Sequence, residues 1–237
     1  MVDTVSHRPV HAGSRSDESR RNAFLETATS VFARRGFEAP TMEELALACG
    51  CERRTLYRYF PSRDEFFWAA VARAYGRMVE RFQLVFGVWE SAKLPALARL
   101  HSWGVTYFEY SLDFPEAFRL VMAGRERTVA AHAAAPAEIA QVAAATGMGA
   151  RLGELAALDQ AMLGGIMSLA PRLEQEGLCE GGVASDRLWE LIGVLIAIVE
   201  FHARYRGGGT DYPFGTPEGI KTMIERQVEA AFPREET

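Results

Sequence analysis

The stretch TMEELALACGCERRTLYRYFPSR, residues 41–63, decides the fold of the N-terminal part of the chain. Thr41 and Glu44 stand at the T-x-x-E spacing of a capping box, in which each side chain satisfies a backbone N–H group at the start of a helix. Gly50 ends this first helix, and a second short helix is predicted over Arg53–Phe60, before a Pro-Ser pair breaks it. Two short helices joined by a tight turn indicate a helix-turn-helix.

The residue types of the second helix suit a nucleic acid. The two helices can pack through small and apolar residues: Leu45, Ala46, Cys49, Cys51 and Leu56. The residues that then point outward from the second helix are Arg53, Arg54, Thr55, Tyr57, Arg58 and Tyr59. Guanidinium and hydroxyl groups bind base edges and phosphate oxygens, and a short exposed helix fits the major groove. Arg63 follows where helix amides and a cation can hold a phosphate. The alternative is a three-helix bundle whose basic edge binds no DNA.

Over Arg21–Ala70 the sequence resembles the TetR family of bacterial transcriptional regulators, most specifically in TLYRYFPSR, residues 55–63. The resemblance implies a homodimer with an N-terminal DNA-binding domain and a helical C-terminal domain that binds a small effector. Carried over by position, it implies a phosphate contact for Thr41, base contacts for Arg53, Arg54 and Thr55, and contacts with the DNA backbone for Tyr57, Tyr59 and Arg63.

Three features depart from the usual family pattern. Glu52 replaces the usual Ser cap, which weakens the start of the second helix. Arg54 replaces a small residue and adds a cation to the reading face, so the operator sequence is harder to infer. Cys49 and Cys51 replace small aliphatic residues; we interpret them as small buried hydrophobes, with a redox switch as the alternative.

The rest of the chain is predicted to be helical, because no segment alternates apolar and polar residues as a strand would. After a first helix that ends at Gly36, further helices are expected near 62–89, 94–110, 114–123, 127–145, 151–176, 185–205 and 217–232. The expected organisation is a disordered arm over residues 1–16, a helix-turn-helix domain over 17–61, and a helical effector-binding and dimerisation domain over 62–237.

Aromatic residues gather on consecutive helices of the C-terminal part, where they could line an apolar cavity with a few polar groups. The candidate ligand-binding residues are Trp103, Tyr107, Phe118, Met122 and Met167. The effector is expected to be a small apolar or aromatic molecule. The alternative for each of these residues is ordinary helical core.

The segment Leu188–Tyr205 is apolar over most of its circumference and must be covered on nearly all sides. With Gly219–Phe232 it could form a four-helix bundle with its symmetry mate, as the resemblance implies; a core helix within one chain is the alternative. The candidate interface residues are Leu188, Ile192, Leu195, Ile196, Val199, Ile224 and Val228.

Charge, cysteine content and hydropathy argue against secreted, disulfide-bonded and membrane-spanning proteins. Residues 1–63 carry ten arginines against eight acidic residues, whereas residues 64–237 carry 16 basic and 23 acidic residues, so a basic head joins an acidic body. Three cysteines fit a reducing cytoplasm better than a disulfide framework. The polar N-terminus predicts no secretory signal, and the longest apolar run is too short to span a bilayer, so no membrane partner is expected.

No metallohydrolase, nucleophile-elbow, P-loop or C-x-x-C motif is present, and the five histidines lack ligand spacing. We therefore expect no enzyme activity, cofactor or metal. The expected protein is a cytoplasmic repressor that a ligand releases from double-stranded DNA at a near-palindromic operator. The alternative is a small-molecule-binding or enzymatic helical protein with a vestigial DNA-binding head.

Overall fold

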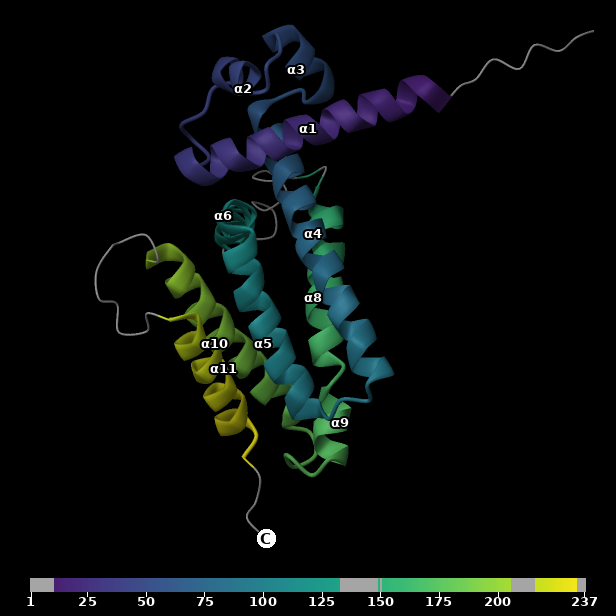
Figure 1. Ribbon diagram of the computed structural model, residues 1–237, viewed down its shortest axis with the longest axis vertical. Coiled ribbons are helices and arrows are strands. Elements are labelled where there is room, and N and C mark those ends of the chain that lie inside the picture. Colours follow the sequence, from purple (N-terminus) through teal and green to yellow (C-terminus); the bar gives the residue numbers. More distant parts are fainter. Residues whose placement is uncertain (1–10, 133–148, 150, 206–215, 234–237) are drawn as a thin grey trace, which may run out of the picture.

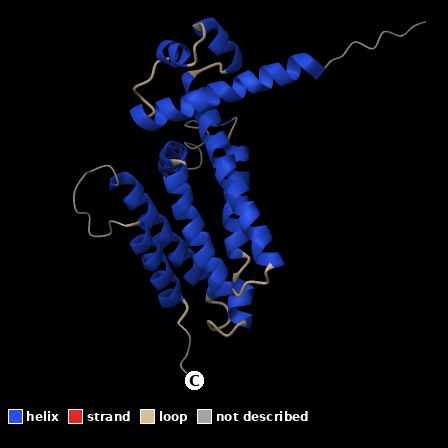
Figure 2. Ribbon diagram, viewed as in Figure 1, coloured by secondary structure: helices blue, strands red, loops and turns tan. Residues whose placement is uncertain are grey.

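The computed structural model describes residues 11–132, 149, 151–205 and 216–233, and this part of the chain contains helices and no strands (Figure 2). It has two parts (Figure 1). The head consists of α1 (His11–Arg35), α2 (Met42–Ala48), α3 (Arg53–Tyr59) and the first turns of α4 (Arg63–Ser91). The body consists of the rest of α4 and the helices that follow it. The all-α prediction is therefore confirmed for the described residues.

The head is held together by an aromatic core that joins α1 and α3 to the beginning of α4. Phe60 stacks on Phe66 with ring centroids 4.1 Å apart, and Phe32 meets Phe67 edge to face at 5.2 Å. All four rings are buried, as is Leu56 of α3. Because α4 continues from this core into the body, any tilt of α4 moves the head.

The N-termini of both helices of the helix-turn-helix, α2 and α3, have the capping features that the sequence predicts. The Thr41 hydroxyl accepts from the Glu44 backbone N–H at 3.2 Å, and the Thr41 backbone N–H donates to Glu44 Oε2 at 2.8 Å, so the capping box is complete. Together with a bond from Arg35, these contacts lower the pKa of Glu44 to about 2. Glu52 begins α3 without a side-chain cap, as expected for a residue that is not among the preferred N-caps.

Replacing Thr41 by alanine is expected to lower the free energy of unfolding by about 1 kcal/mol, because the orphan N–H of Glu44 loses its acceptor. Thr41→Ser keeps the oxygen and serves as the control, with a loss of only a few tenths of a kcal/mol expected. Urea denaturation measures both. An equal loss in the two variants would show that the cap contributes nothing.

Helix boundaries differ from the prediction in the first helix and in the predicted helix over 151–176. α1 begins at His11, so residues 11–16 are helical and their assignment to a disordered arm is wrong; residues 1–10 lie outside the described part. The predicted helix over 151–176 is divided into α8 (Leu152–Met167) and α9 (Ala170–Gln175). Pro171 favours this break, because it lacks the N–H that would bond to the carbonyl four residues back, and it lies in the first turn of α9, where that N–H is not needed.

The body packs its remaining helices around α5 (Ala96–Asp113) (Figure 1). α6 (Pro115–His132) lies under the head and outlasts its predicted end at 123 by nine residues; the rest of the predicted helix over 127–145 lies outside the described part. α10 (Ala184–Tyr205) and α11 (Pro217–Ala231) run side by side along α5, and α8 packs on α4. Among the described residues, no helix combines the length and hydropathy needed to cross a membrane.

The junction between α4 and α6 is unusually close. A Cβ atom added at Gly124 of α6 would lie 2.7 Å from a methyl group of Val71 on α4. Only glycine at position 124 permits this close approach of α6 to α4 without displacing Val71. The two helices are therefore tightly packed directly below the head.

Candidate nucleic-acid interface and effector site

The exposed face of α3 carries three arginines, of which Arg53 is ion-paired, Arg58 donates to the Tyr59 hydroxyl at 3.2 Å, and Arg54 does neither. The Arg53 guanidinium is ion-paired with Glu43 of α2, donates to the Tyr57 hydroxyl at 3.3 Å and lies over the Tyr57 ring at 5.3 Å. Arg54 is exposed, and no carboxylate of the described residues lies within ion-pair distance of it. Arg54 is therefore the cation of α3 most available to an anionic or base-edge partner.

The two tyrosines of α3 differ in what their hydroxyl groups can do. Tyr57 is 37% exposed and accepts from Arg53, so its own proton remains available to a phosphate oxygen. Tyr59 is half-buried, packs edge to face on Phe24 at 5.3 Å and donates its proton to Asp17 at 2.6 Å. Tyr59 thus fastens α3 to α1 in this structure.

Arg63 lies at the contact between head and body. Its Nη1 donates to the backbone carbonyl of Glu38 at 3.0 Å, and its guanidinium lies over the Phe37 ring at 4.5 Å. Arg127 of α6 lies over the same ring at 3.7 Å and pairs with the Glu38 carboxylate at 2.9 Å. These four residues, the junction cluster, connect α6 to the loop before α2.

The remaining predicted DNA contacts have different degrees of exposure. Thr41 is exposed, although its hydroxyl already caps α2, and Thr55 is half-buried on α3. The structure also places four acidic residues among the arginines that the sequence pattern had singled out: Asp17, Glu38, Glu43 and Asp64. Each of these carboxylates weakens the attraction of the head for a polyanion.

The thiols in the turn are poorly suited to redox chemistry. Burial raises the pKa of Cys49 to about 12, and burial also raises the pKa of Cys51. Since the thiolate is the reactive form, both side chains are expected to be inert near neutral pH. The geometry agrees with their interpretation as small packing residues.

Four of the five candidate ligand-binding residues are brought together inside the body. Trp103 and Tyr107 of α5 are fully buried and stack with centroids 5.6 Å apart and planes 6° apart. Tyr107 also packs on Phe118 at 5.3 Å and donates to Met122 Sδ at 3.4 Å, both on α6. Met167 stands at the end of α8, half-buried against the hydrophobic core.

A buried polar cluster surrounds this aromatic group, and the sequence pattern did not reveal it. Tyr75 of α4 donates to Asp159 of α8, and burial together with that carboxylate raises the pKa of Tyr75. Burial raises the pKa of Tyr107 and of Glu200 on α10. The positive charge of Arg125 on α6 opposes the rise in pKa at all three groups.

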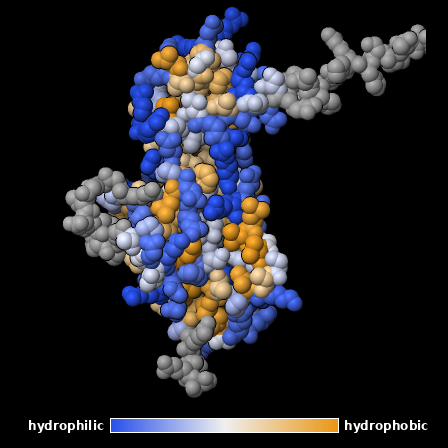
Figure 3. Space-filling view, in the orientation of Figure 1, coloured by the Kyte–Doolittle hydropathy of each residue, from blue (hydrophilic) through white to orange (hydrophobic). Residues whose placement is uncertain are grey.

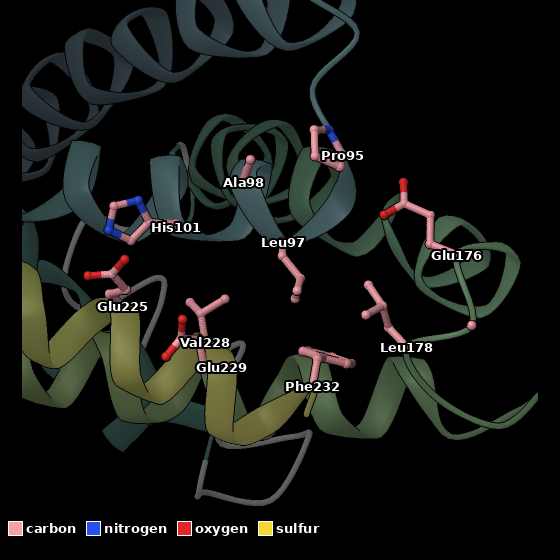
Figure 4. A pocket seen from close by; sticks show the side chains of 11 residues that line it. Pro95, Leu97, Ala98, His101, Glu176, Leu178, Glu225, Val228, Glu229 and Phe232 are labelled. Atoms are coloured by element: carbon pink, nitrogen blue, oxygen red, sulfur yellow. The ribbon is translucent and has the colours of Figure 1, made fainter. Parts of the chain in front are cut away.

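A separate groove of about 890 Å³ opens between α5, α11 and the connection from α9 to α10 (Figure 4). Leu97, Leu178 and Phe232 form apolar parts of its wall. Glu176 at its edge already accepts from the Ala96 backbone N–H at 3.0 Å and so caps α5. Among the described residues, no group of three or more histidines, cysteines or carboxylates is arranged to hold a metal ion.

Most residues predicted for the dimer face of α10 and α11 pack inside the single chain. The buried ones are Leu188, Ile192, Leu195, Val199, Ile224 and Val228. Ile196 alone among the candidates is only partly buried. The apolar residues of α10 that reach solvent are Trp189, Val194, Phe201 and Tyr205. Of these, Val194, Phe201 and Tyr205 share one face of the helix, the exposed stripe, and Trp189 lies on another face. A helix that is apolar all round has two apolar faces, and only packing shows which one turns inward.

These features define a helix-turn-helix protein with a helical body. Residues 24–70 match the bacterial regulatory proteins of the tetR family. An HTH-type transcriptional regulator of Mycobacterium tuberculosis is 38% identical over 65 residues, which are 27% of this chain and 32% of that protein. The chain thus matches about a third of the length of its curated relatives.

Solved structures extend the likeness from the head to the body. A putative TetR-family regulator from Mesorhizobium loti shares 17% identity and a TM-score of 0.58, over 90% of this chain and 95% of that one. The fatty acid degradation regulator FadR from Bacillus halodurans shares 12% identity and a TM-score of 0.61, over 91% of this chain and 99% of that one. The N-terminal domain is therefore similar in sequence to the tetR family of regulators, and the described residues share the fold of these solved structures.

Proposed function

We propose that the protein is a sequence-specific transcriptional regulator, a cytoplasmic homodimeric repressor that a small ligand releases from a near-palindromic operator. The observation that carries this proposal is the exposed face of α3, where Arg54 has no acidic partner and Arg53 and Tyr57 are held beside it. Arg54, Arg53 and Thr55 then face base edges in the major groove, and Thr41 and Tyr57 contact phosphates.

Two of the proposed backbone contacts require an exchange of partners. Tyr59 must release Asp17 before its proton can be donated to a phosphate, and Arg63 must turn away from Glu38. The negatively charged DNA phosphates are strong hydrogen-bond acceptors. They therefore compete with the present carboxylate and carbonyl acceptors for the donors of these two side chains. The acidic partners hold the side chains in place until DNA replaces them.

The dimer is proposed to form through the exposed stripe. Phe201 and Tyr205 are 47% and 51% exposed although both are large aromatic residues, and α11 packs beside α10 and on α5. Exposed apolar residues at helical spacing indicate a surface covered by another helix. A two-fold pairing of α10 and α11 with a second copy would cover these residues and join two reading heads.

Coupling between ligand and DNA is proposed to pass through α6. Phe118 and Met122 contact the aromatic group in the body, and Arg127 on the same helix belongs to the junction cluster with the head. A ligand that displaces α6 would therefore also shift Phe37, Glu38 and the start of α4. Release of DNA requires that the ligand bind the shifted arrangement more tightly than the DNA-bound one.

Selection of bound duplexes from a random-sequence pool tests the proposed function. We expect one enriched, near-palindromic site whose half-sites are separated by about one helical turn, roughly 34–36 Å, or a related spacing. If repeated selection enriches no sequence, the head does not read DNA, and the body acts as a small-molecule-binding or enzymatic protein instead.

A further inference from the structure

Two buried N–H donors beside Tyr107 have no acceptor. Trp103 Nε1 and Arg125 Nη1 are both shielded from solvent and form no hydrogen bond, and the Trp103 side chain is fully buried. Trp103 stacks on Tyr107, and Arg125 follows Met122, which accepts a hydrogen bond from Tyr107, by three residues on the same face of α6. A buried donor without a partner costs roughly 1–3 kcal/mol and is uncommon in folded proteins.

The acceptors nearby are bonded to other donors or form no bond with these two. Asp159 accepts from Tyr75, and Met122 Sδ accepts from Tyr107. No ion pair within 4.0 Å joins Glu200 to Arg125 among the described residues. Trp103 Nε1 and Arg125 Nη1 are therefore left without an acceptor.

The residues that surround the two donors are apolar and include an adaptable side chain. Phe118, Met122 and Arg125 are spaced by four and three residues, so they share the face of α6 that meets Tyr107. Met122 is unbranched and changes rotamer readily, so it can make room for a ligand where an aromatic ring could not.

We propose that this cluster recognises the polar end of the effector, and that the effector is an apolar molecule bearing an acceptor oxygen, either a carboxylate or a neutral carbonyl. Arg125 Nη1 and Trp103 Nε1 donate to that oxygen, while the apolar part of the molecule lies against Phe118 and displaces Met122. A molecule whose polar end is an ammonium group offers only donors and leaves both N–H groups unpaired. This inference rests on the proposed function and specifies the chemical class of its ligand.

Three probes with the same apolar part differ in their polar end. Phenylbutyrate has a charged acceptor, its methyl ester has a neutral acceptor, and phenylbutylamine has only donors. Binding to the full-length protein is measured from the shift of the thermal unfolding midpoint and from tryptophan fluorescence. We expect phenylbutyrate or the ester to bind and the amine to leave the midpoint unchanged. Comparing the affinities of phenylbutyrate and its methyl ester shows whether the acceptor oxygen must be charged. Stronger binding of the amine, or binding of none of the three, would overturn the proposal.

Matched variants locate the contact. Arg125→Met keeps the length of the side chain but removes its donors, and we expect it to weaken binding of the preferred probe roughly 10- to 150-fold. Trp103→Phe keeps an aromatic ring but removes Nε1, with a loss of about 2- to 10-fold expected. Arg119→Met, on the exposed face of α6, is the control and should bind as the unaltered protein does.

Unchanged affinity in both Arg125→Met and Trp103→Phe would contradict the assignment, and Arg125→Gln replaces the first variant if that one does not fold. The readout contains no DNA, so the two proposals fail separately. Probe binding without operator binding would remove the proposed regulatory function only, whereas operator binding without probe binding would remove this ligand class only.

Discussion

Replacing Phe201 and Tyr205 together by glutamate is expected to separate the dimer and to weaken operator binding by about 10²- to 10⁴-fold. Both side chains lie in the exposed stripe of α10, so the change leaves the core of each chain intact. In the proposed dimer, four carboxylates would be buried in the interface, where desolvation and mutual repulsion oppose association. A monomer holds one reading head and loses the gain in affinity from binding two half-sites.

Sedimentation velocity measures the dissociation, and fluorescence anisotropy with an operator duplex measures the loss of affinity. The matched control replaces Leu84 and Val88 of α4, which are 73% and 57% exposed, by glutamate. Hydrophobic side chains reach the surface where α4 and α8 run through the lower body (Figure 3), so this control tests whether any exposed apolar pair has the same effect. A double variant of α10 that stays dimeric would show that the copies associate through another surface.

Replacing Arg54 by alanine is expected to cost about 1–3 kcal/mol at the operator, a loss of roughly 5- to 150-fold, while binding to random duplexes changes little. The reason is that a bidentate contact from arginine to guanine specifies a base, whereas a contact with phosphate is independent of sequence. Arg54 is suited to this role because it is exposed and no acidic residue of the described chain pairs with it.

The comparison is Tyr57→Phe, which removes a hydroxyl whose proton is available to a phosphate. This variant should weaken operator and random duplexes by similar factors, measured by anisotropy at one fixed salt concentration. An equal loss on both duplexes for Arg54→Ala would instead assign Arg54 to the DNA backbone.

Local signals predicted the head well because its helices begin and end by short-range chemistry. The Thr41 cap satisfies a backbone group three residues away, and Gly50 adopts a positive φ of 64° at the turn. The absence of a cap at the start of α3 could likewise be predicted from the identity of residue 52 alone. The start of α1 was not, because helical residues exposed to solvent carry no apolar periodicity.

The contacts that distinguish one candidate residue from another could not be predicted in this way. Asp17 and Tyr59 are 42 positions apart, and Glu38 and Arg127 are 89 apart, so no local spacing signals either pair. The same holds for the cluster of Tyr75, Asp159 and Arg125, which forms only when α4, α6 and α8 meet. The inward face of α10 likewise depends on how α5 and α11 cover it.

The most direct test of a reading head on α3 is a titration of the selected operator and of a scrambled duplex of equal length and composition, at two salt concentrations. We predict that two protomers bind the operator at least about 10³-fold more tightly than the scrambled duplex, and that both affinities fall steeply as salt increases. Equal affinity for the two duplexes, or binding that does not respond to salt, would contradict the account.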